Sequence, residues 1–153
     1  MKKMLVSIVG ITILSVIFSS VSLAQRGRGL RGSSGWEPKS AFNRMYNPST
    51  VETIKGEVVS VDKITPMKGM SYGIHLMLKT NKETVSVHLG PARYFDSHKY
   101  SIKPKDKIEI TGSKVSYSGK PAIIAAEVRK GNEVIKLRDE SGYPVWSSGR
   151  RNK

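Results

Sequence analysis

His75 and His88 are the two residues whose type and spacing could together bind a metal ion. Each lies in a run where apolar and polar residues alternate, which predicts two strands joined by a turn centred on Lys82. His75 lies seven residues before this centre and His88 six after it, so the imidazoles should lie nearly opposite each other on the polar face of a hairpin. Cross-strand neighbours have Cβ atoms roughly 5 Å apart, close enough to share copper or zinc.

Thioether sulfur close to the histidines would favour copper. Met67, Met70 and Met77 lie nearby in sequence, and thioether with imidazole suits this metal. The competing interpretation is a pair of surface histidines that hydrogen-bond locally, because no third ligand is fixed. The sequence contains no Cys, which excludes thiolate metal sites and thiol catalysis, and it indicates no cofactor.

A second set of residues mixes aromatic rings with positive charge, the combination that binds extended anionic ligands. Bases or sugar rings stack on aromatic faces, and Lys and Arg contact the anionic groups. The alternative role of such rings is packing, and we expect Phe95 to close the bottom of a barrel. The predicted ligand-binding residues are Tyr72, Tyr94, Tyr117, Lys68, Lys79, Arg93 and Lys114.

The N-terminus has the pattern of a secretory signal peptide over residues 1–24. Lys2 and Lys3 precede an apolar run at 4–18, and Ser22-Leu23-Ala24 supplies small residues at a cleavage site. An uncleaved anchor is the alternative, but the run is short for a membrane span. We therefore expect a periplasmic or secreted protein with no membrane span after signal removal.

The predicted mature chain is strongly basic. The signal peptide holds two of the 26 Lys and Arg residues, so 24 basic residues face 12 acidic ones, a net charge of +12. An exported basic protein can meet nucleic acid or an anionic polysaccharide. The alternative is that the charge serves solubility alone. Because the Asp and Glu residues have no paired partner in sequence and no catalytic constellation is apparent, we expect a protein that is not an enzyme.

The rest of the chain divides into three segments. Residues 25–50 open with Arg-Gly repeats and predict a disordered basic segment, 51–146 form the folded domain, and 147–153 are a basic tail. The aromatic residues of the first segment, Trp36, Phe42 and Tyr46, should pack loosely onto the barrel. Within the domain, Gly90-Pro91 should end a strand and start a short helix over 91–99. Strands are predicted at 51–65, 72–80, 85–89, 108–115, 122–129 and 134–138. This order predicts an all-β, OB-fold-like small barrel with a short helix between strands 3 and 4.

Several runs in the domain resemble small exported bacterial OB-fold proteins, many of which are called DNA-binding proteins on fold grounds. The runs are 51–54, 56–61, 69–76, 87–92 with Tyr94, 120–128, and 137–140 before Trp146. A more distant resemblance is to periplasmic OB-fold proteins linked to stress tolerance. The resemblance implies the fold and an extracytoplasmic location, without an agreed activity.

The sequence thus predicts an exported, non-catalytic protein that binds an extended anionic ligand, either nucleic acid or acidic glycan. Its binding face would be formed by the first three strands and the loops around Met70 and Tyr117. The alternative is a periplasmic protein that binds copper, zinc or a small ligand in stress tolerance.

Overall fold

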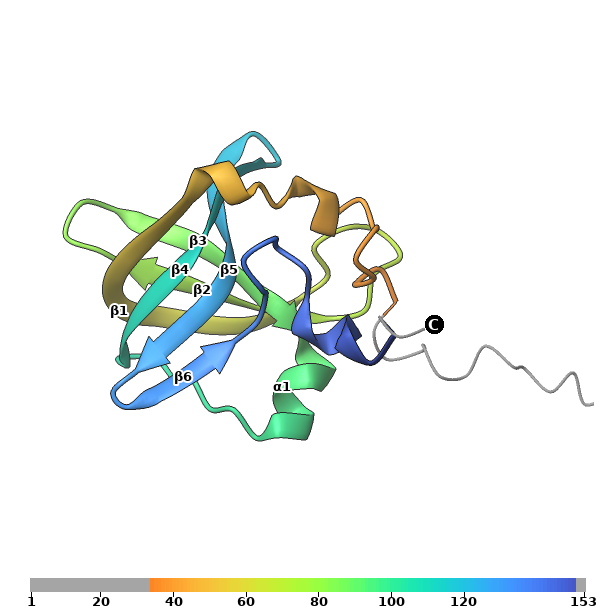
Figure 1. Ribbon diagram of the computed structural model, residues 1–153. Helices are drawn as coiled ribbons and strands as arrows, with labels where there is room; N and C mark the ends of the chain where they lie inside the picture. Colours follow the sequence, from red (N-terminus) through yellow and green to blue (C-terminus); the bar gives the residue numbers. More distant parts are fainter. Residues whose placement is uncertain (1–33, 151–153) are drawn as a thin grey trace, which may run out of the picture.

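Six strands and one α-helix form the part of the chain that the computed structural model describes, residues 34–150 (Figure 1). They are β1 (Val51–Ile64), β2 (Gly73–Lys79), β3 (Thr84–Pro91), α1 (Ala92–His98), β4 (Lys107–Tyr117), β5 (Lys120–Lys130) and β6 (Glu133–Lys136). The sheet order is β3-β2-β1-β4-β5-β6, and β3 also pairs in parallel with β5. This last pairing closes β1 to β5 into a barrel. The protein is an OB-fold, as the sequence predicts.

The long strand β1 bends so that it serves both halves of the barrel. Its first half pairs with β4 and its second half with β2, and Glu57 is the residue that pairs with both. Gly56 lies at this bend because a Cβ there would collide with the carbonyl oxygen of Lys79. A register shift between Val58 and Ser60 adds further curvature.

The β3–α1 junction differs from the sequence expectation. The strand does not stop before Gly90 and Pro91, because these two residues still pair with Ile74 and Gly73 of β2. They are the last two residues of β3. Pro91 is then the N-cap of α1, whose first helical residue is Ala92. The fixed φ of proline is compatible with both an extended strand end and a helix start, so one residue serves both elements.

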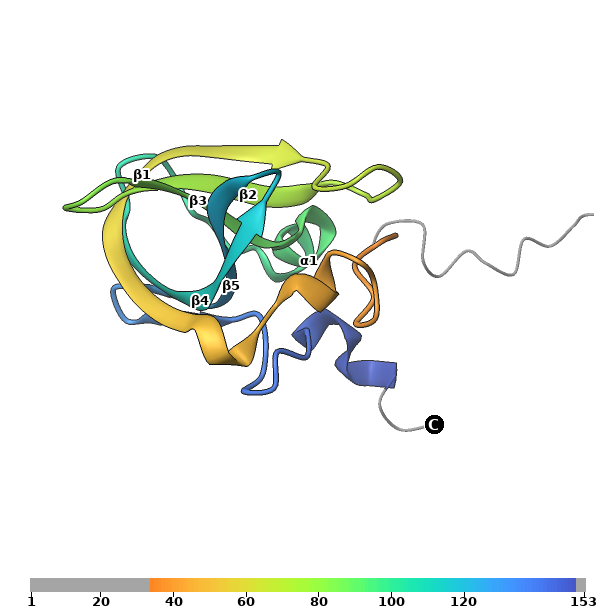
Figure 2. The same cartoon turned by 90° about the horizontal axis from the view of Figure 1, so that it is seen from above.

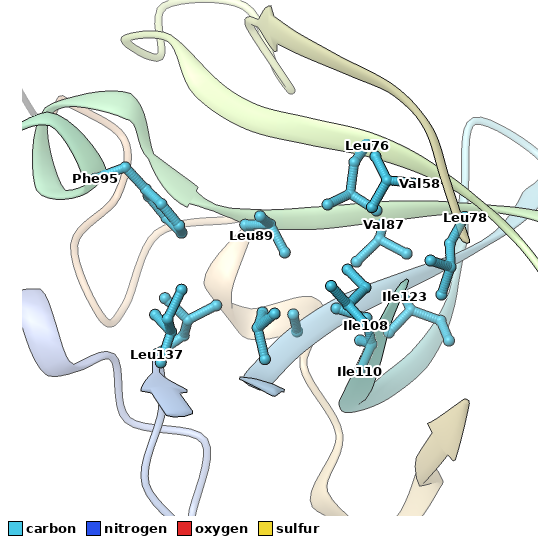
Figure 3. Packing of buried hydrophobic residues seen from close by; sticks show 13 residues of the cluster. Val58, Leu76, Leu78, Val87, Leu89, Phe95, Ile108, Ile110, Ile123 and Leu137 are labelled. Atoms are coloured by element: carbon cyan, nitrogen blue, oxygen red, sulfur yellow. The ribbon is translucent and has the colours of Figure 1, made fainter. Parts of the chain in front are cut away.

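The barrel core is formed by the inward-facing row of each strand. Phe95 of α1 is 4% exposed and packs against this core, so the prediction that it closes the barrel is confirmed (Figure 3). The strand residues of the core include Val58, Leu76, Leu78, Val87, Leu89, Ile108, Ile110 and Ile123. Their burial leaves the alternate residues of each strand on the outer surface.

Residues 34–47, the N-terminal strap, lie against the outside of the barrel (Figure 2). Trp36 and Phe42 are each only 1% exposed, and the Trp36 Nε1 donates to the Ser71 carbonyl oxygen at 3.0 Å. Gly73 is required beneath the strap because a Cβ there would enter the Trp36 ring. The prediction of disorder over 25–50 is therefore wrong for 34–50, where buried aromatic side chains hold the chain. Residues 25–33 lie outside the described part.

Arg138 joins the strap to the C-terminal segment (residues 137–147). Its side chain is 3% exposed, and its guanidinium donates to Asn43 Oδ1 at 2.6 Å and to the Gly142 carbonyl oxygen at 3.1 Å. The guanidinium also lies 5.2 Å from the ring centroids of Tyr46 and Trp146. Burial lowers the pKa of Arg138 to about 10, so the group stays charged at neutral pH.

Replacing Arg138 with Met should lower the free energy of unfolding by about 3 kcal/mol, because two charge-assisted hydrogen bonds are lost and Asn43 is left unsatisfied. Urea unfolding followed by tryptophan fluorescence measures the change. Lys136→Met, on the exposed side of β6, is the matched control and should change stability by less than about 0.5 kcal/mol. Equal losses in the two variants would contradict a clamping role for Arg138.

Candidate binding face

The outward-facing residues of β1, β2 and β3 form a surface, here called the binding face, with two rows across the strands. Asp62, His75 and His88 are successive cross-strand partners in one row. Ser60, Met77 and Ser86 are successive partners in the other row. These side chains face outward because their neighbours along each strand point into the core.

The two histidines are direct partners in the register of β2 and β3, and their ring centroids lie 5.0 Å apart. The hairpin geometry predicted from the sequence is therefore confirmed. His75 Nε2 lies 2.6 Å from Ser86 Oγ, a hydrogen bond that orients this imidazole. Within residues 34–150 no group of three or more His, Cys, Asp or Glu side chains could hold a metal ion. Metal binding by the pair stays a prediction.

His88 is buried rather than exposed on the face. It is 2% exposed, and its ring packs edge-on against Phe42 of the strap at 5.6 Å and Tyr117 at 4.8 Å between centroids. Its Nε2 has no hydrogen-bond partner. Burial, and secondarily the neighbouring His75, lowers the pKa of His88 to about 4, so its ring is neutral at pH 7.

His75 is half-buried, and its pKa is also lowered by burial, although the charge of Asp62 opposes this shift. The row therefore presents one carboxylate and two neutral imidazoles. The middle of the binding face carries little positive charge, and the cations predicted to contact a ligand lie toward its ends.

Three of the predicted ligand-binding residues lie at the end of the face next to α1. Tyr72 is 62% exposed, and its carbonyl oxygen accepts a hydrogen bond from the Ala92 amide, which places it beside the start of the helix. Arg93 is exposed on the first turn. Tyr94 is half-buried, packs 5.9 Å from the Trp146 ring and has a pKa raised to about 12 by burial and by Tyr100.

Tyr117 and Lys68 belong to the two loops that flank the face. The Tyr117 hydroxyl donates to the carbonyl oxygen of Pro66, which ties the end of β4 to the β1–β2 loop. Lys68 is exposed in that loop. The Tyr117 ring is half-buried against His88, so it forms a wall of the face rather than a free stacking surface.

Lys79 and Lys114 lie at the opposite end from Tyr72. Tyr72 directly precedes β2 and Lys79 is its last residue, and the seven residues of this strand span about 20 Å at 3.3 Å per residue. Lys114 lines a hollow of about 770 Å³ together with Lys55 and Lys82, between the start of β1 and the β2–β3 turn. The structure therefore does not gather the predicted residues at one point, but distributes them along an extended surface.

Sequence reasoning expected the aromatic residues of the strap to pack loosely onto the barrel, but it did not predict that they cover the binding face. Phe42 covers His88, and Trp36 covers Gly73 at the start of β2. Trp146 likewise lies over Gly90, the next outward position of β3. A glycine within a strand often marks the close approach of another group. The glycines in β2 and β3, together with aromatic residues outside the strands, were therefore the signal that could have indicated these contacts.

The fold defines the class of protein, a small OB-fold protein. Residues 50–135 match the MamS/MamX magnetosome protein family, which is more than half of the 153-residue chain. The chain belongs to this family. A magnetosome family was not among the resemblances seen in the sequence.

Among solved structures, the chain is similar to the second OB-fold domain of replication protein A from Methanococcus maripaludis, determined by solution NMR. The sequence identity is 18% and the TM-score 0.39, with 55% of this chain and 86% of that domain covered. No curated protein matches the chain. Within residues 34–150 there is no helix long and apolar enough to span a membrane.

Acidification should destabilise the fold through His88. The unfolded chain takes up this proton near pH 6.5, whereas the folded protein resists it until about pH 4, so stability is complete above pH 6.5 and falls as pH drops between these values. Urea unfolding measures the free energy of unfolding at pH 7 and at pH 4.5. The decrease between these two pH values should be larger by about 2 kcal/mol in wild type than in His88→Gln. An identical pH dependence in both proteins would contradict a neutral, buried His88.

Proposed function

We propose that this member of the MamS/MamX family is a non-catalytic binding protein for an extended anionic ligand, a nucleic acid or an acidic glycan. The ligand would lie along the binding face, from the Tyr72 end to the Lys79 end. A path of about 20 Å suits several units of a linear polymer better than one compact molecule. OB-fold barrels bind such polymers with the same strands and the flanking loops.

The observation that carries this proposal is the set of unpaired cations along the path. Lys68, Lys79, Arg93 and Lys114 are exposed, and none forms an ion pair with a carboxylate within the described residues. Some other surface cations within the described residues are compensated, such as Lys130 by Asp106 at 2.9 Å, whereas others, such as Lys136 of β6, are exposed without an ion pair. Uncompensated charge on an exposed surface is available to a polyanion and supplies most of the affinity in contacts of this kind.

We also propose that the protein is exported, since its N-terminal sequence has the signal-peptide pattern. Residues 1–33 lie outside the described part, so this rests on the sequence. The family is described as a magnetosome protein family, and we propose that binding of the anionic ligand serves the magnetosome. The proposal that the protein is not an enzyme rests on the use of OB-folds for binding. The run 69–73 has the spacing G-x-S-x-G, but it lies in the loop that leads into β2 and not at the strand-to-helix turn that a catalytic serine of this motif requires.

Binding should weaken with salt in proportion to the number of anionic groups contacted. Fluorescence anisotropy with labelled single-stranded DNA should show log affinity falling linearly with log salt, by about 0.7 per neutralised phosphate. The Lys79→Gln/Lys114→Gln variant should flatten this slope by about 1.4, and Lys136→Gln on β6 should not change it. A labelled acidic oligosaccharide tested in parallel separates the two ligand classes. If neither ligand binds more tightly than about millimolar at low salt, the proposal is wrong.

Tyr72 should supply stacking that does not depend on charge. Tyr72→Ala should cost about 1–3 kcal/mol of binding free energy without changing the salt slope, because one aromatic surface is lost and no cation is removed. Tyr72→Phe is the matched control and should bind like wild type. Equal binding by the alanine and phenylalanine variants would show that the ring at this position makes no contact.

A further inference from the structure

We propose that His75, His88 and Met77 bind one copper(I) ion on the outer face of β2 and β3. The proposal does not rest on the proposed polyanion binding, because its ligands are two imidazoles and a thioether in the middle of the binding face and not the cations at its ends. Both rings come from adjacent strands of a hydrogen-bonded sheet, so their spacing is set by the backbone and not by a mobile loop.

The strongest structural sign is the orphaned nitrogen of His88. His88 is only 2% exposed, and its Nε2 has no hydrogen-bond partner. Buried polar atoms are almost always satisfied, and an unsatisfied one calls for a partner such as a water or an ion. The imidazole closest to it is that of His75, at 5.0 Å between centroids.

His75 is oriented in the way that metal-binding histidines are. Its Nε2 makes the 2.6 Å hydrogen bond with Ser86 Oγ, and in the tautomer that donates this bond Nδ1 carries a free lone pair. Met77 lies two residues further along β2 on the same face and is the cross-strand partner of Ser86. A thioether therefore lies on the same face as the imidazoles, in the neighbouring cross-strand row.

The surroundings favour a singly charged, soft ion. The described residues offer no third His, Cys, Asp or Glu ligand, so a zinc ion that needs four such groups is poorly served. Copper(I) is satisfied by two imidazoles with or without a thioether. The rings of Phe42 and Tyr117 exclude water around His88, and a low-polarity environment penalises a divalent ion more than a monovalent one.

Anaerobic titration of the full mature protein with copper(I) against a chromophoric copper(I) chelator tests the proposal. Wild type should withdraw one equivalent from the chelator. His75→Gln should weaken binding at least tenfold, and Met77→Leu, which preserves side-chain volume, should weaken it several-fold. His98→Gln and Met45→Leu, which change residues outside the proposed site, are the matched controls and should bind like wild type.

A second measurement does not depend on variants of a partly buried residue. In the NMR spectrum of wild type, one equivalent of copper(I) or silver(I) should shift the ring signals of His75 and His88 and the methyl signal of Met77, and leave His98 unchanged. The proposal is overturned if no equivalent is withdrawn, if His75→Gln and Met77→Leu both bind like wild type, or if His98 shifts in place of the pair. None of these outcomes affects the salt-dependent binding of a polyanion.

Discussion

The buried guanidinium of Arg138 is the interaction on which the arrangement outside the barrel depends. It bonds to Asn43 of the strap and to Gly142 of the C-terminal segment, and it lies against the rings of Tyr46 and Trp146. A buried charge must find such partners or destabilise the fold. Its Nη1 and Nη2 bond to carbonyl and amide oxygens and its plane lies against aromatic rings, although its Nε has no hydrogen-bond partner. Because these partners come from both segments, the strap and the C-terminal segment are held on the barrel together.

This attachment determines which part of the OB-fold surface is open. The strap places Phe42 over His88, and Trp36 and Trp146 over the glycines at the adjoining ends of β2 and β3. The open surface is therefore the remainder of the face, between the exposed ring of Tyr72 and the cations at the far end of β2. The strap thus narrows the open part of the binding face and places aromatic side chains along its edge.

The barrel could be predicted from the sequence because strand alternation is a local signal that tertiary packing reinforces. The cross-strand pairing of His75 with His88 could be predicted from the same alternation and from the position of the turn between the two strands. The strap could not be predicted in this way, because its aromatic residues have no periodicity and their burial depends on contacts distant in sequence, such as Arg138 with Asn43. For the same reason the burial of His88, which comes from Phe42 and Tyr117, was not visible in its own strand.

The proposed ligand would bind on the open part of the binding face while the strap stays in place. Amide chemical-shift mapping of the mature protein at low salt, first with single-stranded DNA and then with an acidic oligosaccharide, tests this most directly. We expect shifts at Tyr72, Met77 and Lys79 with one of the two ligands, and unchanged signals for Asn43 and Arg138. Shifts confined to β6, or release of Asn43 and Arg138 on binding, would contradict it.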